Sequence, residues 1–121
     1  MPILRFIVLQ DAGTYTIPAG TWHRVRACGM EAFSGSLLYT DIVRATVPAP
    51  YSLSGGMATP VPLCPGVPYG GVGSNAPVMQ TVPIDLWLPP GTTYAAHCGV
   101  NTIATIAIEE YTEEEHHHAT T

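Results

Sequence analysis

The sequence predicts an all-β domain: an antiparallel β-sandwich or jelly roll that carries a long, uncharged arm rich in proline and glycine. Short runs of β-branched and aromatic residues are separated by Pro and Gly along the chain, the pattern typical of sandwiches and barrels. No stretch has the roughly 3.6-residue apolar period of a long amphipathic helix. The 121 residues suffice for one domain with a modest core. We assign residues 1–111 to this β domain and residues 112–121 to an acidic, histidine-containing tail.

Seven segments are expected to form strands: 3–9, 14–17, 22–28, 37–47, 84–88, 92–98 and 102–111. In the first, alternation places Leu4, Phe6 and Val8 on one face and Arg5 on the other. The second is a short run that ends at Pro18. These two segments therefore open the predicted sandwich.

The remaining strand predictions follow the same alternation. The segment 22–28 places its two arginines opposite Val25 and Ala27, and 37–47 is the longest candidate. In 84–88 the three aliphatic residues share a face opposite Asp85 and Trp87. The segments 92–98 and 102–111 complete a set that fits two packed sheets.

Two similar turns interrupt this pattern, Pro18-Ala19-Gly20-Thr21 and Pro89-Pro90-Gly91-Thr92. Proline fixes φ at the start of such a turn, glycine accepts a positive φ, and a β-branched threonine begins the next strand. We expect two tight hairpin turns with Gly20 and Gly91 at positive φ. The spacing from each glycine to the following cysteine differs by one residue, so recurrent turn chemistry is preferred to an internal duplication.

The segment 45–84 is the predicted arm: forty residues without Asp, Glu, Lys or Arg that hold eight of the chain's twelve prolines. Because each proline removes a ladder donor, no central strand is expected there. Depletion of charge with many apolar side chains is typical of a protein interface. We expect an ordered arm on a neighbouring protein chain, the alternative being an arm that folds back on its own sandwich. Its candidate partner-binding residues are Tyr51, Leu53, Met57, Leu63, Tyr69, Val72 and Met79.

The charge balance limits the classes of partner that the chain is expected to bind. Only 11% of residues are charged, against a usual ~25%, and the chain has four arginines and no lysine. With a net charge of -5, it lacks the basic footprint that nucleic-acid binding needs. No apolar stretch approaches the ~20 residues of a membrane span, and residues 1–9 do not resemble a signal peptide. Other protein chains, including copies of itself, are the expected partners.

Candidate chemical groups do not assemble into an expected active site, so we predict no enzyme and no cofactor. The odd number of cysteines indicates packing residues in a reducing compartment, with a Cys28–Cys98 bridge as the alternative. His97 and Cys98 are adjacent, so on a strand they face opposite ways. The three consecutive side chains of His116–His118 diverge, and therefore no metal site is expected. The tryptophans and tyrosines are compatible with a sugar-stacking surface, but aromatic residues of a β domain more often serve its core or a protein interface.

The phrases YTIPAGT at 15–21 and LWLPPGTT at 86–93, with the sparse charge and abundant Thr, Ala, Pro and Gly, carry a family resemblance. The chain resembles small β-sandwich structural proteins of tailed-bacteriophage virions. The resemblance implies a location in the virion, assembled in the host cytoplasm, and at this size a capsid decoration or cement protein that binds the major capsid protein. A tail or head–tail joining component and a lectin-like glycan-binding module are the alternatives.

Overall fold

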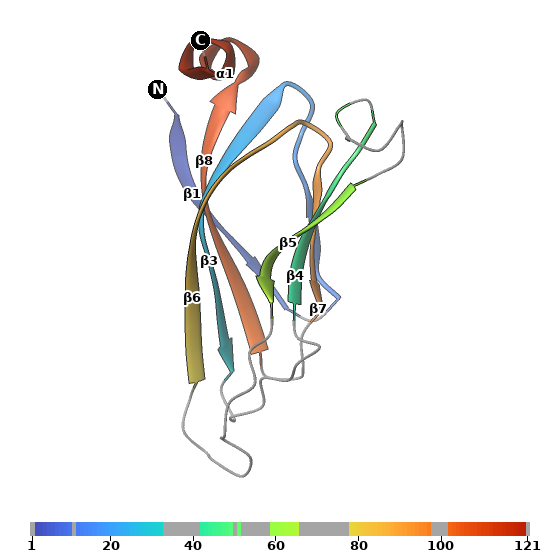
Figure 1. The fold of residues 1–121 in the computed structure, drawn as a ribbon, viewed down its shortest axis with the longest axis vertical. Helices are drawn as coiled ribbons and strands as arrows, with labels where there is room; N and C mark the ends of the chain where they lie inside the picture. The colour runs from blue at the N-terminus through green and yellow to red at the C-terminus, as the bar shows by residue number, and fades with distance from the viewer. Residues whose placement is uncertain are drawn as a thin grey trace.

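The computed structural model describes residues 2–10, 12–32, 42–49, 51, 59–65, 78–97 and 102–120. Two β-sheets face each other, and a short helix lies at one end of one of them (Figure 1). The elements of the described part of the chain are β1 (Ile3–Leu9), β2 (Thr14–Thr16), β3 (Thr21–Ala32), β4 (Ile42–Val47), β5 (Thr59–Pro65), β6 (Val78–Leu88), β7 (Thr93–His97), β8 (Thr102–Thr112) and α1 (Glu113–Thr120).

The strands form two four-stranded antiparallel sheets. Sheet A has the order β1-β8-β3-β6, and sheet B has the order β2-β7-β4-β5. The pairs β1·β8, β2·β7, β3·β6 and β4·β5 are those of one long hairpin folded across both sheets. The predicted all-β antiparallel sandwich is therefore confirmed.

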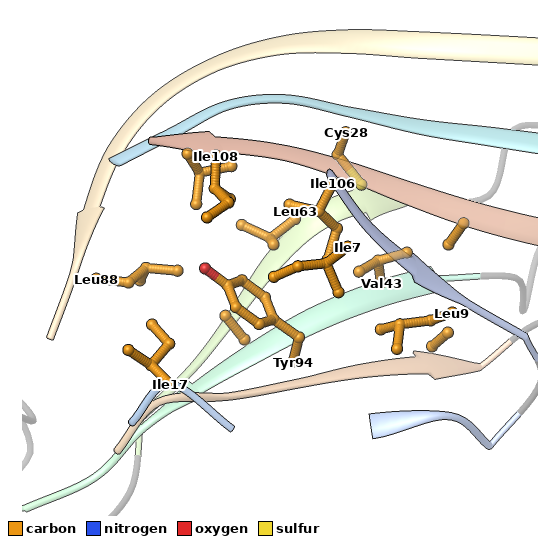
Figure 2. Close-up of a cluster of buried hydrophobic side chains, with 14 of the residues drawn as sticks. Ile7, Leu9, Ile17, Cys28, Val43, Leu63, Leu88, Tyr94, Ile106 and Ile108 are labelled. Atoms are coloured by element: carbon orange, nitrogen blue, oxygen red, sulfur yellow. The ribbon is translucent and has the colours of Figure 1, made fainter. Parts of the chain in front are cut away.

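The core lies between the sheets, where alternate residues of each strand point inward. Figure 2 shows Tyr94 reaching from β7 toward Ile106 and Ile108 of β8, with Val43 of β4 nearby. Cys28 is fully buried in the same cluster, as its predicted packing role requires. Each large apolar side chain buried here contributes roughly 1.5–3 kcal/mol, so this cluster is the main source of stability.

The two glycine turns have the predicted conformation. Gly20 has φ of 78° and Gly91 has φ of 84°. In each turn the N–H of the threonine donates to the carbonyl of the first proline, at 3.2 and 3.3 Å. The expectation of positive φ is confirmed, and the physical reason is the absence of a Cβ atom.

The hairpin interpretation of these turns is wrong. The first turn joins β2 in sheet B to β3 in sheet A, and the second joins β6 in sheet A to β7 in sheet B. The turns also bond to each other: Ile17 donates to the carbonyl of Thr92 at 2.8 Å, and Gly91 donates to the carbonyl of Ile17 at 2.9 Å. They are paired crossings between the sheets, which a local sequence pattern does not distinguish from hairpin turns.

The segment 45–84 contributes more to the sandwich than predicted. Its first three residues end β4, which lies between β7 and β5, and its last residues belong to β6. It also supplies the whole of β5, although this strand contains Pro60, Pro62 and Pro65. Both β5 and β6 are edge strands, where proline is tolerated because one side of the strand needs no ladder partner. In place of an arm over its whole length, the segment 45–84 thus supplies the end of β4, all of β5 and the first part of β6, and its residues 50, 52–58 and 66–77 lie outside the described part of the chain.

Most of the acidic, histidine-containing tail is helical, because Glu113–Thr120 form helix α1. Thr112 caps it: the N–H of Glu115 donates to the Thr112 hydroxyl at 3.1 Å, and the Thr112 N–H donates to the Glu115 carboxylate at 2.9 Å. This reciprocal pair is a capping box. Three glutamates in the first turn also suit the positive end of the helix dipole.

Candidate functional site

Strand β1 carries an exposed row of large apolar side chains. Its inward residues Ile7 and Leu9 are only 5% and 6% exposed, as the core requires. On the outer face of sheet A, Leu4, Phe6 and Val8 are 64%, 63% and 59% exposed. We call these three residues the apolar ridge. The described part of the chain has five exposed large hydrophobic residues. Four of them lie on β1, namely Ile3 and the three residues of the ridge.

The position of β1 leaves the ridge open. β1 is the first strand of sheet A and is paired on one side with β8. The residue opposite Phe6 on β8 is Ala107, and the residue opposite Val8 is Thr105. These short side chains do not screen a phenylalanine. A contiguous apolar row with one open side is the kind of surface that proteins use to bind proteins.

A second group of residues forms a polar network between the sheets. His23 of β3 is fully buried, with Nδ1 2.8 Å from the Tyr94 hydroxyl and Nε2 3.3 Å from the Glu110 carboxylate. Arg5 of β1 donates to Glu110 at 2.7 Å and to the hydroxyl of Tyr15 at 3.4 Å. These five residues come from five strands and both sheets. We refer to them as the interior polar network.

The proton positions in this network follow from its donors and acceptors. A carboxylate can only accept, so His23 Nε2–H donates to Glu110, and the neutral ring then accepts the Tyr94 O–H at Nδ1. Burial lowers the pKa of His23, although the hydrogen bond that its ring donates to Glu110 opposes this shift. Burial also raises the pKa of the Tyr94 hydroxyl well above its ordinary value. Both shifts keep the rings neutral, which is the state their hydrogen bonds need.

This arrangement suits a structural role better than a catalytic one. A nucleophilic hydroxyl is activated by a lowered pKa or by a base that can take its proton, whereas the Tyr94 pKa is raised and the basicity of His23 is reduced. Tyr94 lies in the hydrophobic core, away from any open surface. The network satisfies buried polar groups and fixes sheet B against sheet A.

A third group, the aromatic cluster, connects the outer face of sheet A to α1. Trp22, Trp87 and Tyr111 belong to the sheet, His116 belongs to α1, and Tyr51 follows β4. The His116 ring stacks on Trp22 with centroids 3.6 Å apart and planes 3° from parallel. Trp22 Nε1–H also donates to Glu113 at 3.0 Å, and Trp87 packs edge-on against both His116 and Tyr111. These contacts hold the helix on the sheet.

The aromatic cluster gives little room for a sugar-stacking surface. His116 covers one face of Trp22, and the ring of Tyr51 lies nearly perpendicular to the indole, with centroids 5.6 Å apart. Arg24 lies 5.6 Å from the centroid of Trp87 and is itself held by two hydrogen bonds to Asp85, at 2.8 and 3.0 Å. Both tryptophans are thus engaged by their own chain.

The predicted partner-binding residues divide into four groups. Tyr51 is exposed and lies beside Trp22, as a surface contact would require. Leu63 is 4% exposed and belongs to the core of its own sandwich, so its assignment to a partner surface is corrected. Met79 lies on β6, and only its backbone is described. The other four lie outside the described residues: Leu53, Met57, Tyr69 and Val72.

Sequence reasoning missed the apolar ridge as a site. The alternation of residues 3–9 correctly separated Leu4, Phe6 and Val8 from Arg5. It did not show which of the two faces would be buried, because Ile3, Ile7 and Leu9 make the other face apolar as well. The signal for an exposed apolar surface was that both faces of this short strand are apolar.

Over the residues that the structure describes, no group of three His, Cys, Asp or Glu side chains is placed to hold a metal ion. Within the same residues no helix has the length and apolar character needed to cross a membrane. No protein-family model and no curated protein matches the chain.

Proposed function

We propose that this chain is a structural protein that binds other protein chains, and specifically a virion protein that decorates or cements a bacteriophage capsid. The observation that carries the proposal is the apolar ridge, three large side chains each about three-fifths exposed in one row. Left in water, each forgoes roughly 1.5–3 kcal/mol that burial would supply. Contact with a partner chain would recover part of this free energy.

The strand order supports the more specific assignment to a virion. Orders β1-β8-β3-β6 and β2-β7-β4-β5 are those expected when an eight-stranded hairpin is rolled into two sheets, and on this basis we propose a jelly roll. Jelly rolls serve as viral capsid domains and also as lectins and cupins. The engagement of Trp22 and Trp87 within the chain favours the first of these roles.

The composition agrees with a protein that functions in an assembly. Only 11% of the residues are charged and lysine is absent, although a soluble monomer normally presents many charges to water. The interior polar network meanwhile fixes the sandwich without any partner, because its bonds all lie within one chain. A rigid domain with a bare apolar surface fits a protein that seals neighbouring capsid subunits.

Co-sedimentation with empty shells of the source bacteriophage tests this function. We expect the wild-type protein to sediment with shells and Phe6→Ser to bind them much more weakly. Arg44→Ser is the matched control, because Arg44 is exposed and lies between the buried Val43 and Ala45, on the outer face of sheet B. Failure of the wild type to bind would overturn the capsid assignment. Equal binding by Phe6→Ser would remove the ridge as the contact.

A further inference from the structure

The four edge strands of the two sheets differ sharply in how they are protected. An exposed strand edge presents unpaired N–H and C=O groups that can pair with another chain, and natural proteins block this with short strands, proline, charge or bulges. The edges of sheet A are β1 and β6, and those of sheet B are β2 and β5. Their sequences show which edges are blocked.

Three edges carry such protection. Strand β2 has only three residues. Strand β5 has prolines at three of its seven positions, each without a donor N–H. Strand β6 contains Pro83 beside a register shift in its pairing with β3, and exposes Asp85 two residues later. None of these three offers a long, regular ladder to another strand.

Strand β1 has no comparable protection. Its seven residues contain no proline and no glycine, and its pairing with β8 is regular from Ile3 to Leu9. Its one charge, Arg5, is paired with Glu110 at 2.7 Å, which holds the pKa of the guanidinium above its ordinary value. We propose that β1 pairs edge to edge with β1 of a second copy of this chain, forming an antiparallel dimer with an eight-stranded sheet.

The sequence of β1 selects the register of this pairing. A two-fold axis normal to the sheet places outer side chains opposite outer side chains. The axis must therefore lie midway between one residue and the same residue of the second copy, and we name each axis by that residue. An axis through Phe6 pairs all seven residues and places Arg5 opposite the partner copy's residue 7, an isoleucine. An axis through Arg5 would bring two arginines face to face, which destabilises a strand pair. An axis through Ile7 would pair only five residues.

The proposed dimer closes on itself and enlarges the ridge. Pairing through Phe6 sets Leu4 beside the second copy's residue 8 and Val8 beside its residue 4, so that two apolar ridges become one continuous surface. Because the other edges are protected, the pairing stops at two copies rather than extending into a fibre. The inference deepens the proposed function, on which its biological role rests: a dimer would present a doubled surface to a shell.

Sedimentation equilibrium of the purified chain over a dilution series tests the association directly. We expect a species of twice the 12.8 kDa chain mass that dissociates on dilution. The register is tested with two double variants at the same exposed positions. Leu4→Glu with Val8→Glu sets like charges opposite each other and should weaken the dimer by about tenfold relative to Leu4→Glu with Val8→Lys, which sets opposite charges together.

A cysteine placed on the axis gives an independent measurement that does not depend on affinity. With the axis through Phe6, Phe6→Cys lies opposite its own copy and should form a disulfide-linked dimer on mild oxidation. Leu4→Cys is the matched control, because the two copies of position 4 lie roughly 13 Å apart and cannot be bridged. The native cysteines are the same in both variants, so a difference reports the register.

The outcomes separate this inference from the proposed function. A monomer at every concentration, or equal cross-linking of both cysteine variants, would overturn β1 pairing even if the chain binds shells. A dimer that forms as described but does not sediment with shells would support the pairing and overturn the capsid assignment. A monomer that instead captures an extended segment of a different virion protein along β1 would also overturn self-pairing.

Discussion

The outer face of sheet A has two halves that differ in what covers them. Over β3 and β6, Trp22 and Trp87 lie under helix α1, whose His116 stacks on the first ring and meets the second edge-on. Over β1, Leu4, Phe6 and Val8 are open to solvent. We call the half under α1 the covered half and the half over β1 the bare half.

The difference shows how a short helix determines where a partner can bind. α1 follows β8 directly and contacts β8 and β3, the two central strands of sheet A. Its contacts there are aromatic and polar, with the Trp22 indole donating to Glu113. The apolar ridge has no such closing element among the described residues. We infer that the covered half belongs to the stability of the monomer and the bare half to association.

Removal of the Trp22 side chain, in the covered half, should cause the largest loss of stability. We expect Trp22→Ala to lower the free energy of unfolding by about 2–3 kcal/mol, because the half-buried indole supports both the sheet and α1. Urea denaturation followed by circular dichroism measures the change. His117→Ala, at an exposed position of the same helix, should change it by less than about 0.5 kcal/mol. Equal effects of the two variants would show that the covered half does not depend on Trp22.

Acid should lower the stability of the domain through His23, the buried residue that follows Trp22 in β3. Burial lowers the pKa of His23 in the folded protein below its unfolded value, so the unfolded chain binds more protons as the pH falls. The free energy of unfolding should therefore decrease as the pH falls below about 6.5, with a slope of at most about 1.4 kcal/mol per pH unit from this group. Urea titrations from pH 8 to pH 5 measure the slope.

A substitution separates His23 from other titrating groups. His23→Gln should lower stability at neutral pH and also remove the contribution of His23 to the slope. Burial lowers the pKa of His116 too, so a smaller dependence of the same sign should persist. An unchanged slope in His23→Gln would show that the interior polar network is not the acid-sensitive element.

Loss of the helix cap should have a smaller effect. Thr112→Ala removes the hydroxyl that accepts the Glu115 N–H, and we expect a loss of about 1 kcal/mol with fraying of α1. Thr112→Ser retains the hydroxyl and should remain close to the wild type. Amide hydrogen exchange in residues 113–120 provides the measurement. If the serine variant frays as much as the alanine variant, the capping box does not hold the helix.

The sequence predicted the parts of this fold that depend on local chemistry. Alternation and turn residues identified the all-β class, most of the strand positions and the positive φ of Gly20 and Gly91. It did not identify β5, because three prolines argue against a strand unless its place at a sheet edge is known. It also missed α1, although Thr112 and Glu115 have the spacing of a capping box.

The candidate site was harder to predict, because it depends on which side of a strand is buried. Leu63 was assigned to a partner surface and lies in the core, since an uncharged segment looks alike whether it packs on its own chain or on another. The ridge on β1 was not singled out for a similar reason: both faces of the strand are apolar. Only their burial in the core between the sheets shows that Ile7 and Leu9 point inward.

Substitution in the bare half should have the smallest effect on the stability of the monomer. Phe6→Ser should change the free energy of unfolding by less than about 0.5 kcal/mol, because 63% of the side chain is already exposed in the folded monomer. The measurement requires dilute protein, since dimerisation would add a concentration-dependent term. Ile7→Val, one residue along the strand but buried, should cost about 0.5–1.5 kcal/mol despite removing a single methylene. If Phe6→Ser destabilises the dilute monomer more than Ile7→Val does, the ridge is part of the monomer's own packing, and its proposed role in association fails.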